Sequence, residues 1–378
     1  LVMFAAAGMV MVAHATHMVS LLIGIETMSL AAYVLTGCWR KSLRSSEGAM
    51  KYFLMGAFAT SFLVYGIAMI YGTTGGEMSY AGIAAKVNGA TRMPLFFLGE
   101  YFILVALAFK VAVVPFHMWA PDVYEGAPTS VTAFLSTGSK AASFALYARI
   151  FSEALGGMRE DWAPLLGLVA AITIMVGNWA AVTQENSKRL LAYSSISNAG
   201  YLLLALVADN EFGRIGLIIY LFVYTLMNMG AFGVIISLRR RGIIGDNVDD
   251  LTGLGQKAPL MAAMMAIFML SLGGLPMTGG FIGKYFLFGG LLQRGATDGK
   301  SWYYWLAGWA ILNTVVSFYY YVRFIKVMYL GDRIADNKPL ALSPALQVAL
   351  AVSVVGVIVV GLYPQPLIAL AQNLLPSL

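Results

Sequence analysis

The chain has 378 residues, of which 60% are hydrophobic and only 11% are charged, and its formal net charge is +6. A soluble domain carries roughly 25% charged residues, so this composition excludes an ordinary soluble domain and indicates a protein of the lipid bilayer. The positive charge is spread over connecting segments, which argues against a nucleic-acid-binding surface, and the single cysteine, Cys38, excludes an internal disulfide, a thiolate-ligated cluster or a zinc site.

Apolar stretches of about 20 residues recur along the whole chain, and a helix of that length crosses the roughly 30 Å of a bilayer's hydrocarbon core. Bounded by glycine, proline and charge clusters, they predict an all-α integral membrane protein with about eleven transmembrane helices. The predicted segments are 1–13, 18–38, 48–71, 94–119, 128–151, 162–183, 188–208, 212–238, 258–292, 302–330 and 343–370.

The loops between these segments alternate in charge. The loops that begin at Trp39, Asn186, Arg239 and Gly331 are basic, whereas those at residues 75–80, 157–162 and 208–214 are neutral or acidic. Because lysine and arginine favour the cytoplasmic side of a membrane, this alternation places the basic loops in the cytoplasm. The first residues lack an initiator Met and a basic leader region, which leads us to expect that the chain begins partway through a longer protein.

Two predicted segments contain helix-breaking residues at membrane depth. The fourth has Pro115, and the ninth gathers one proline and four glycines: Gly273, Gly274, Pro276, Gly279 and Gly280. Such breaks are tolerated in a membrane only where protein or water satisfies the freed backbone groups. The two breaks lie five helices apart, and a five-helix unit that repeats must do so with inverted orientation. We therefore predict two inverted repeats, 1–152 and 153–330, followed by a C-terminal helix in 331–378.

Ionisable side chains inside spans cost several kcal/mol and usually serve a function. Four occur here: Glu26, Lys110, Lys140 and Lys284. Each lysine can carry a proton, but an ammonium cannot ligate a metal cation. The row of lysines, with breaks that supply water-accessible backbone, therefore favours proton movement across the membrane.

Alternatives remain open for several of these residues. Glu26 lies near mid-depth with Lys51 as its expected partner, although Lys51 could also be an interfacial lysine whose stem reaches the surface. Lys110 is a relay or a structural counter-ion to a carboxylate, and His117 is a relay or a core residue. Other ionisable residues near helix ends, Glu100 among them, default to interfacial roles. Haem ligation by His14 and His17, at a helix junction, is not expected.

Three motifs resemble the antiporter-like membrane subunits of respiratory complex I, and the similarity runs over essentially the whole chain. They are PFHMWAPDVYEGAPTSVTAFLSTGSKAA, NSKRLLAYSSISNAGYLLLAL and GGLPMTGGFIGKYFLF. The resemblance implies fourteen helices in two inverted five-helix repeats with flanking helices, of which this chain lacks the first three. Lys284 favours the N branch of the family over subunit M, and the absence of a long lateral helix after the last span disfavours subunit L.

The resemblance also implies roles for individual residues. Glu26 and Lys51 would act as a switch that modulates Lys110, with His117 in the same broken helix. Protons would then pass through Lys140 toward an exit at Lys284. Many relatives have a histidine where this chain has Asn198, and Asn198 cannot titrate, so a relay at that point would need water.

A complex I subunit of this type implies partners and cofactors elsewhere. We expect no cofactor in this chain, with flavin, iron–sulfur clusters and quinone in partner subunits, and we expect neighbours of the M, K and J types in the bilayer. The alternatives are a subunit of a multi-subunit Na⁺/H⁺ antiporter or of a membrane-bound hydrogenase. A purely structural scaffold would not need Glu26, Lys110, Lys140 and Lys284 at depth.

Overall fold

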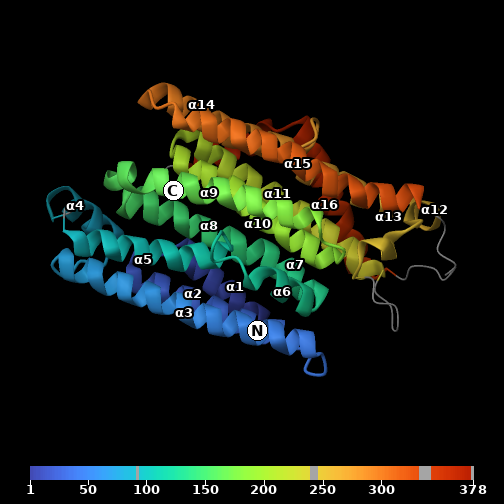
Figure 1. Cartoon of the computed structure of the whole chain (residues 1–378), viewed down its shortest axis with the longest axis horizontal. Coiled ribbons are helices and arrows are strands. Elements are labelled where there is room, and N and C mark those ends of the chain that lie inside the picture. Colours follow the sequence, from blue (N-terminus) through green and yellow to red (C-terminus); the bar gives the residue numbers. More distant parts are fainter. Residues whose placement is uncertain (91–92, 239–245, 332–341, 376–378) are drawn as a thin grey trace. The chain divides into compact units, whose positions relative to one another are not determined.

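The computed structural model describes residues 1–90, 93–238, 246–331 and 342–375, and every named element in these ranges is a helix (Figure 1). Within the described residues, seven helices are long and apolar enough to cross a membrane. They are α2 (Met18–Thr36), α3 (Leu43–Thr73), α5 (Pro94–Val111), α9 (Arg159–Val182), α10 (Ser187–Ala208), α11 (Glu211–Leu238) and α16 (Pro344–Leu362). The predicted all-α membrane fold is confirmed.

The other predicted segments are also helical. Segment 1–13 is α1 (Val2–Ala13), and segment 302–330 is α15 (Trp302–Leu330). Segment 128–151 consists of α7 (Thr129–Phe134) and α8 (Lys140–Arg149), and segment 258–292 consists of α13 (Pro259–Gly273) and α14 (Gly279–Asp298). Prediction missed the short α4 (Tyr80–Ala90) and merged α17 (Gln365–Leu374) with α16. The basic residues predicted at 239–241 and 332–338 lie outside the described residues.

Both predicted breaks are present. Helix α5 ends at Val111, Ala112 adopts a left-handed conformation with φ 59°, and α6 (Trp119–Gly126) begins after a turn. Helix α13 ends at Gly273, Gly274 is left-handed with φ 86°, and α14 begins at Gly279. In each case a left-handed residue closes the first half-helix, which is a common way to end a helix.

Helix starts follow from the local sequence. Pro94, Pro259 and Pro344 each stand in the first turn of a helix, where the missing N–H of proline removes no intrahelical hydrogen bond. Ser42 accepts a hydrogen bond from the Ser45 N–H at the start of α3, as an N-cap residue does. These signals place the helix boundaries, whereas the uniformly apolar composition leaves the buried faces to tertiary packing.

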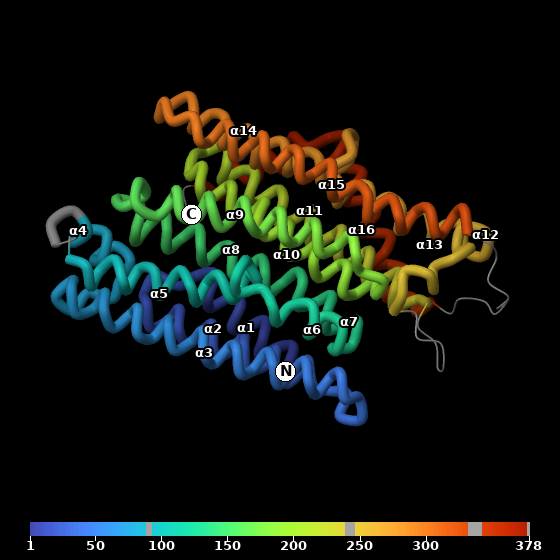
Figure 2. Tube along the Cα trace, in the orientation of Figure 1, coloured from blue at the N-terminus to red at the C-terminus, as the bar shows by residue number. Residues whose placement is uncertain are grey.

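Contacts divide the chain into two compact units. The first unit consists mainly of Leu1–Pro128 and Gly138–Thr173, and the second of Thr129–Thr137 and Ile174–Pro376. In the first unit α3 packs along α5 and α6, and α1 packs against α2 and α8, as Figure 2 shows for α3 and α5. In the second unit α11 packs against α13, α14 and α16, and α10 packs against α14. The two inverted repeats at 1–152 and 153–330 stay a prediction. The compact units are defined by contacts, whereas a repeat is defined by internal symmetry, so the units do not test it.

Segment 128–151 contains irregular turns that sequence patterns did not predict. A π-helical turn, Leu135–Ser139, joins α7 to α8, and a second one, Ile150–Ala154, follows α8. A π-helical turn inserts an extra residue in a helix and is found frequently at functional sites. The first of these turns ends directly before Lys140.

Candidate functional site

Lys284 is enclosed by the break that precedes it. Its side chain lies on the second turn of α14 and is 3% exposed. The ammonium donates hydrogen bonds to the carbonyl oxygens of Leu272, at 2.9 Å, and Gly273, at 3.4 Å, which are the last two residues of α13. The end of a helix leaves such carbonyls without intrahelical partners, and its dipole favours a cation. The second break therefore supplies the solvation that a buried ammonium needs.

Tyr201 connects Lys284 to a hydrogen-bonded network in the second unit. The Lys284 ammonium lies 4.7 Å from the centroid of the Tyr201 ring. The Tyr201 hydroxyl accepts hydrogen bonds from Thr314 Oγ1 at 3.1 Å and Asn178 Nδ2 at 3.5 Å. Asn178 in turn accepts a hydrogen bond at 2.9 Å from the Tyr320 hydroxyl. Lys284 and Thr314 also line a mainly apolar cavity of about 570 Å³.

Asn198 lies at the centre of the next part of this network. Its Nδ2 donates to the Ser194 carbonyl at 2.9 Å, and its Oδ1 accepts from the Tyr220 hydroxyl at 2.5 Å. The Tyr321 hydroxyl lies 2.5 Å from Ser194 Oγ and 3.4 Å from Asn198 Nδ2. The ring centroids of Tyr320 and Tyr321 are 4.4 Å apart, so the part of the network around Tyr201 lies beside the part around Asn198. Asn198 is thus held by side-chain hydroxyls and backbone.

This network follows α10 for about two turns. Ser194 precedes Tyr201 by seven residues, which corresponds to roughly 10 Å along a helix. Both residues are buried. Helix α10 is also the most enclosed of the seven candidate spans, because 94% of its apolar stretch is buried inside the protein. A continuous set of buried hydroxyl and amide groups therefore runs from the Lys284 level toward the start of α10.

Lys110 is bound in a different way from Lys284. It lies on the last turn of α5 and is 7% exposed, but its ammonium donates a hydrogen bond to Ser29 Oγ on α2. Ser29 Oγ in turn donates to the Ile25 carbonyl. The ring of Tyr33 lies 5.8 Å from the ammonium. The carbonyl of Phe109 beside the break accepts a 2.9 Å hydrogen bond from the Trp119 indole.

Glu26 lies on α2, three residues before Ser29, and is half-buried. Residues three apart share a helix face, so the Glu26 carboxylate and the Ser29 hydroxyl that binds Lys110 are neighbours. The Glu26 carboxylate also accepts a 2.7 Å hydrogen bond from Thr60 Oγ1 on α3. Glu26 and Lys110 therefore belong to one cluster in the first unit.

The expected pairing of Glu26 with Lys51 is wrong. Lys51 forms 2.7 Å ion pairs with Glu47 on its own helix and with Asp122 on α6, and its side chain is 44% exposed. Thr60, which binds Glu26, follows Lys51 by nine residues on α3, or roughly 14 Å of helix. Lys51 is too far from the Glu26 level, and a nearer carboxylate is available to it.

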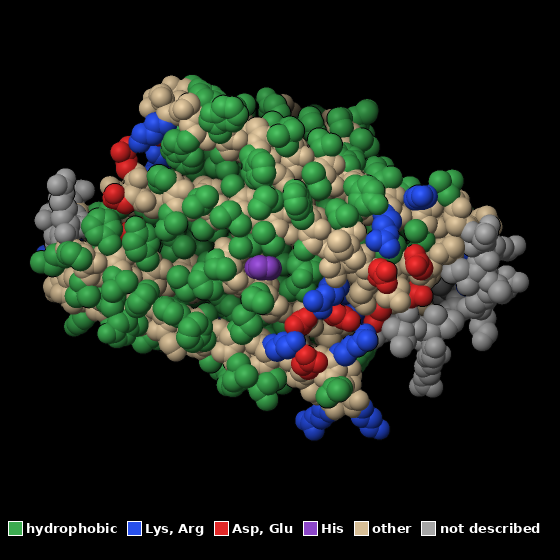
Figure 3. All heavy atoms as spheres, viewed as in Figure 1, with side chains coloured by type: hydrophobic (Ala, Val, Ile, Leu, Met, Phe, Trp, Pro, Cys, Tyr) green, Lys and Arg blue, Asp and Glu red, His purple; other side chains and the backbone are tan. Residues whose placement is uncertain are grey.

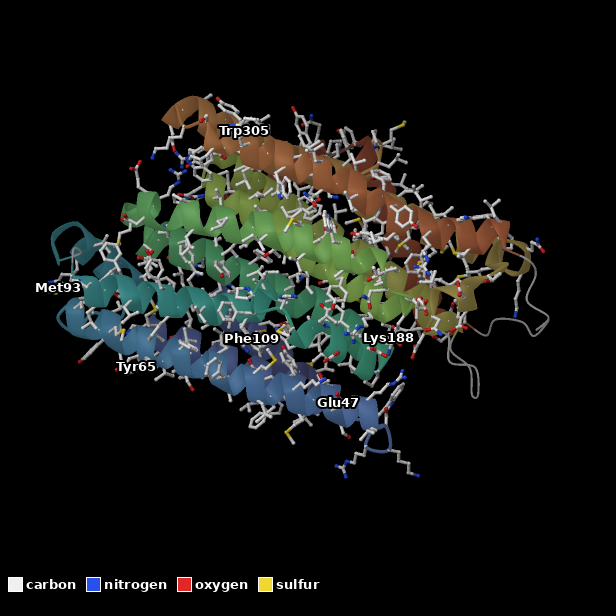
Figure 4. All side chains as sticks on the ribbon, viewed as in Figure 1. Glu47, Tyr65, Met93, Phe109, Lys188 and Trp305 are labelled. Atoms are coloured by element: carbon white, nitrogen blue, oxygen red, sulfur yellow. The ribbon has the colours of Figure 1, made fainter. Side chains whose placement is uncertain are left out.

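Charged side chains gather around Lys51 at the start of α3. Glu47 is labelled there in Figure 4, and Figure 3 shows basic and acidic side chains grouped in the same region, next to an apolar surface. Arg44 forms a 3.2 Å ion pair with Glu125, and these residues with Glu47 and Asp122 line a cavity of about 160 Å³. Asp122 and Glu125 lie in the first of the three family motifs, but their pairing with α3 depends on the three-dimensional fold.

Lys140 begins α8 directly after the π-helical turn and is 5% exposed. Its neighbours Ser139 and Ser143 are buried, and the Ser143 hydroxyl donates to the Ser139 carbonyl at 2.8 Å. Lys140 and Lys110 are both in the first unit.

The histidines have more ordinary surroundings. His117 lies in the turn between α5 and α6, half-buried, and its Nδ1 is enclosed without a hydrogen-bond partner among the described residues. His17 caps α2 by accepting a 3.3 Å hydrogen bond from the Val19 N–H, and His14 Nδ1 lies 3.0 Å from the Val10 carbonyl. Capping accounts for His14 and His17, whereas His117 has an available ring nitrogen beside the first break.

Glu100, which sequence reasoning assigned to the interface, is completely buried. Its side chain is 0% exposed, and both carboxylate oxygens are without a hydrogen-bond partner among the described residues. Its position seven residues into α5 suggested an interfacial residue, but neighbouring helices cover it. No signal in the sequence distinguishes these two cases.

Comparisons with known proteins identify the family of the chain. A family model described as "NADH:quinone oxidoreductase/Mrp antiporter, TM" matches residues 15–309. NADH-quinone oxidoreductase subunit N 2 of Solibacter usitatus (strain Ellin6076) is 48% identical over 373 residues, which cover 99% of this chain and 74% of that protein.

Solved structures give the same result. A chain of respiratory complex I from Thermus thermophilus with bound aureothin is 35% identical with a TM-score of 0.81, and the match covers 97% of this chain and 78% of that one. A chain of the Mrp complex from Dietzia sp. DQ12-45-1b has a TM-score of 0.85 at 22% identity, with 98% and 76% covered, a likeness that shows the fold alone. The chain therefore belongs to the family of antiporter-like membrane subunits of NADH:quinone oxidoreductase and Mrp antiporters, and within it resembles the subunits named N.

Proposed function

We propose that this multi-pass membrane protein is a proton-translocating subunit of an NADH:quinone oxidoreductase, in which buried Glu, Lys and His side chains carry protons while other subunits transfer electrons. The observation that supports this most strongly is the burial of three lysines, Lys110, Lys140 and Lys284, each at most 7% exposed inside a bilayer protein. Buried ammonium groups in spans are costly and mark ion or proton routes. The Solibacter usitatus relative is named as a subunit of NADH-quinone oxidoreductase, and the Thermus thermophilus chain belongs to respiratory complex I.

In the first unit, the proposed proton sites are Glu26, Lys110, Lys140 and His117. The Ser29 hydroxyl links Lys110 to the helix face that carries Glu26, so a change of charge on Glu26 acts directly on the Lys110 ammonium. Lys51 would enter this route through Asp122 and Glu47, not through Glu26. Its cluster, with the cavity beside it, would serve as the aqueous mouth.

In the second unit, the proposed site is Lys284 with the hydroxyl and amide network along α10. A hydroxyl donates and accepts at the same time, and so does an amide, so such groups can order a chain of water without titrating themselves. The network would then serve at the point where the family resemblance implies a histidine and this chain has Asn198. The order Lys110, Lys140, Lys284 is the one that the family resemblance implies.

Cofactors and neighbours follow from the same proposal. Flavin, iron–sulfur clusters and quinone would be bound by partner subunits, and this chain would hold none. In the bilayer it would pack beside an antiporter-like subunit of the M type and small subunits of the K and J types.

The test is NADH-driven proton translocation in membrane vesicles that contain the whole complex. Lys110→Ala and Lys140→Ala are expected to lower the number of protons moved per NADH, with subunit content unchanged. Parent-like translocation in both variants would favour a scaffold role. Loss of sodium resistance alone would favour an Na⁺/H⁺ antiporter subunit, and co-purification with flavin- and iron–sulfur-containing subunits would support the oxidoreductase.

A further inference from the structure

Glu100 is a buried acid to which the proposed route assigns no role. It lies on α5 between Met93 and Phe109, which Figure 4 labels near the two ends of that helix. Its side chain is 0% exposed, and neither carboxylate oxygen has a hydrogen-bond partner in the part of the chain that the structure describes. An ionised carboxylate buried without a partner costs several kcal/mol, whereas the neutral acid costs much less. Such a group changes its charge when water or a proton reaches it.

The depth of Glu100 can be read along α3, which packs against α5. Lys51 and its carboxylate partners lie near the start of α3, and Thr60 binds Glu26 roughly 14 Å farther along. Gly66 follows by about another 9 Å and packs directly on Gly99, since a Cβ on Gly66 would lie 2.7 Å from the Gly99 carbonyl oxygen. Acidic groups therefore stand at three successive levels of the first unit: Asp122, Glu26 and Glu100.

The residues beside Glu100 on α5 pack against α3. Gly99 lies against Gly66, and the ring of Phe102 contacts the ring of Tyr65. Helix α8 brings the buried Tyr147, whose hydroxyl donates to the Leu104 carbonyl at 3.4 Å, one turn after Glu100. Asp161, in the first turn of α9, interacts with Glu100 electrostatically. Tyr147 follows Lys140 by seven residues on the same helix, so it stands between the level of Lys140 and that of Glu100.

We propose that Glu100 is a further proton-binding residue of the first unit, which exchanges protons between the Lys110–Lys140 level and the membrane side opposite to the Lys51–Asp122 cluster. The inference rests on the proposed function. The substrate is the proton itself, passed to and from the carboxylate oxygens through water, and the Tyr147 hydroxyl orders that water from the α8 side. Asp161 marks the aqueous end of the path.

The experiment compares Glu100→Gln, Glu100→Asp and Glu160→Gln in the intact complex. Glu160 is an exposed acid beside Asp161 and serves as the matched control. Protons moved per NADH are measured in vesicles together with subunit content. We expect Glu100→Gln, which keeps size and polarity, to lower the proton ratio, Glu100→Asp to restore part of it, and Glu160→Gln to match the parent. A purely structural role for Glu100 would change stability but leave the proton ratio of the assembled complex unaltered, and that outcome overturns the proposal.

Two further measurements keep the result unambiguous. Lys110→Ala and Lys140→Ala are assayed in parallel: if they lose translocation and Glu100→Gln does not, only this inference fails, and if they also match the parent, the proposed function fails. Should Glu100→Gln not assemble, the unmodified complex is treated with a hydrophobic carbodiimide, which adds to protonated acids in apolar surroundings. Mass spectrometry then reads the adduct at Glu100 separately from Glu26. Loss of translocation in step with labelling of Glu100 is expected, and full translocation with Glu100 labelled, or no labelling at all, overturns the proposal.

Discussion

The ammonium nitrogen of Lys284 lies 2.9 Å from the carbonyl oxygen of Leu272, so a cation on α14 is bound by the last turn of α13. The break between the two half-helices is what makes this possible, because an unbroken helix would use that carbonyl for its own hydrogen bonding. Lys110 stands beside the other break but is bound across to Ser29 on α2. Two breaks of similar backbone geometry thus hold their lysines by different acceptors.

Two substitutions of Lys284 distinguish the role of its positive charge from the role of its ability to release a proton. Lys284→Arg keeps a cation for the Leu272 and Gly273 carbonyls, but arginine does not give up its proton. Lys284→Met removes the donor and leaves these buried carbonyls unsatisfied, at a cost of about 1–3 kcal/mol in the free energy of unfolding. We expect both variants to lose proton translocation and only Lys284→Met to lose stability, measured by vesicle pumping and thermal unfolding of the complex. Active Lys284→Arg would contradict the proton-carrier role.

The left-handed residues at the two breaks, Gly274 and Ala112, predict opposite effects of substitution on stability. Gly274 has φ 86°, and a Cβ there would lie 3.1 Å from the Lys284 Cδ atom, so Gly274→Ala should lower the free energy of unfolding by about 1–2 kcal/mol. Ala112 already carries a Cβ at φ 59°, so Ala112→Gly should be neutral or slightly stabilising. Thermal unfolding of both variants checks this pair. Equal destabilisation by the two substitutions would show that the backbone conformation is not the cause.

Tyr321 and Tyr319 form a matched pair for the network along α10. The Tyr321 hydroxyl contacts Ser194 and Asn198, whereas Tyr319 is 65% exposed. Tyr321→Phe removes the contact and should cost about 1 kcal/mol of stability while slowing proton translocation. Tyr319→Phe should match the parent in both assays. Equal translocation rates in the two variants would remove Tyr321 from the route.

Ser29 is the side-chain acceptor for Lys110, and its removal should affect both stability and function. Ser29→Ala leaves a buried ammonium without this partner, which costs about 1–3 kcal/mol. Ser61→Ala, on the exposed face of α3, is the control, because the Ser61 hydroxyl donates to the Ala57 carbonyl of its own helix. We expect reduced translocation in Ser29→Ala alone, read by the same vesicle assay. A stable Ser29→Ala variant with full activity would show that Lys110 does not depend on α2.

The Lys51–Asp122 ion pair predicts a charge-swap result. Both side chains are partly exposed, so the ion pair contributes about 1 kcal/mol or less to the free energy of unfolding. Each single substitution, Lys51→Asp or Asp122→Lys, removes this contribution and adds repulsion between like charges. The double variant should recover translocation better than either single variant, because it restores opposite charges across α3 and α6. If instead Glu26→Lys rescued Lys51→Asp and Asp122→Lys did not, the pairing with Asp122 would be wrong.

The sequence predicts the two helix breaks but not the partners of most buried polar side chains. Pro115 and the glycines near Pro276 predict the breaks directly, because proline and glycine change the local backbone conformation whatever packs around them. The acceptor of Lys284 lies 12 residues away on the same broken helix and so follows from the break. The partner of Lys51 is 71 residues away and that of Ser194 is 127 residues away, so each depends on which helices pack together.

Burial of single residues was the least predictable feature. Glu100 and Lys51 both lie near the start of an apolar helix, yet Glu100 is 0% exposed and the Lys51 side chain 44% exposed. Uniformly apolar helices lack the polar stripe that marks an outward face in soluble proteins, so the pattern does not say which side faces lipid and which faces protein. The π-helical turns were missed for a related reason, since residues 135–139 have no unusual composition.

The π-helical turn at Leu135–Ser139 fixes the direction in which Lys140 points. One residue corresponds to about 100° of rotation in an α-helix, and a π-helical turn takes up one extra residue locally. If the same residues formed a regular α-helix, Lys140 would therefore point about 100° away from its present direction around the helix axis, without any change in the lysine itself. The length of this segment is thus as much a determinant of chemistry as its composition, and the insertion of one more residue there should be more harmful than most point substitutions nearby.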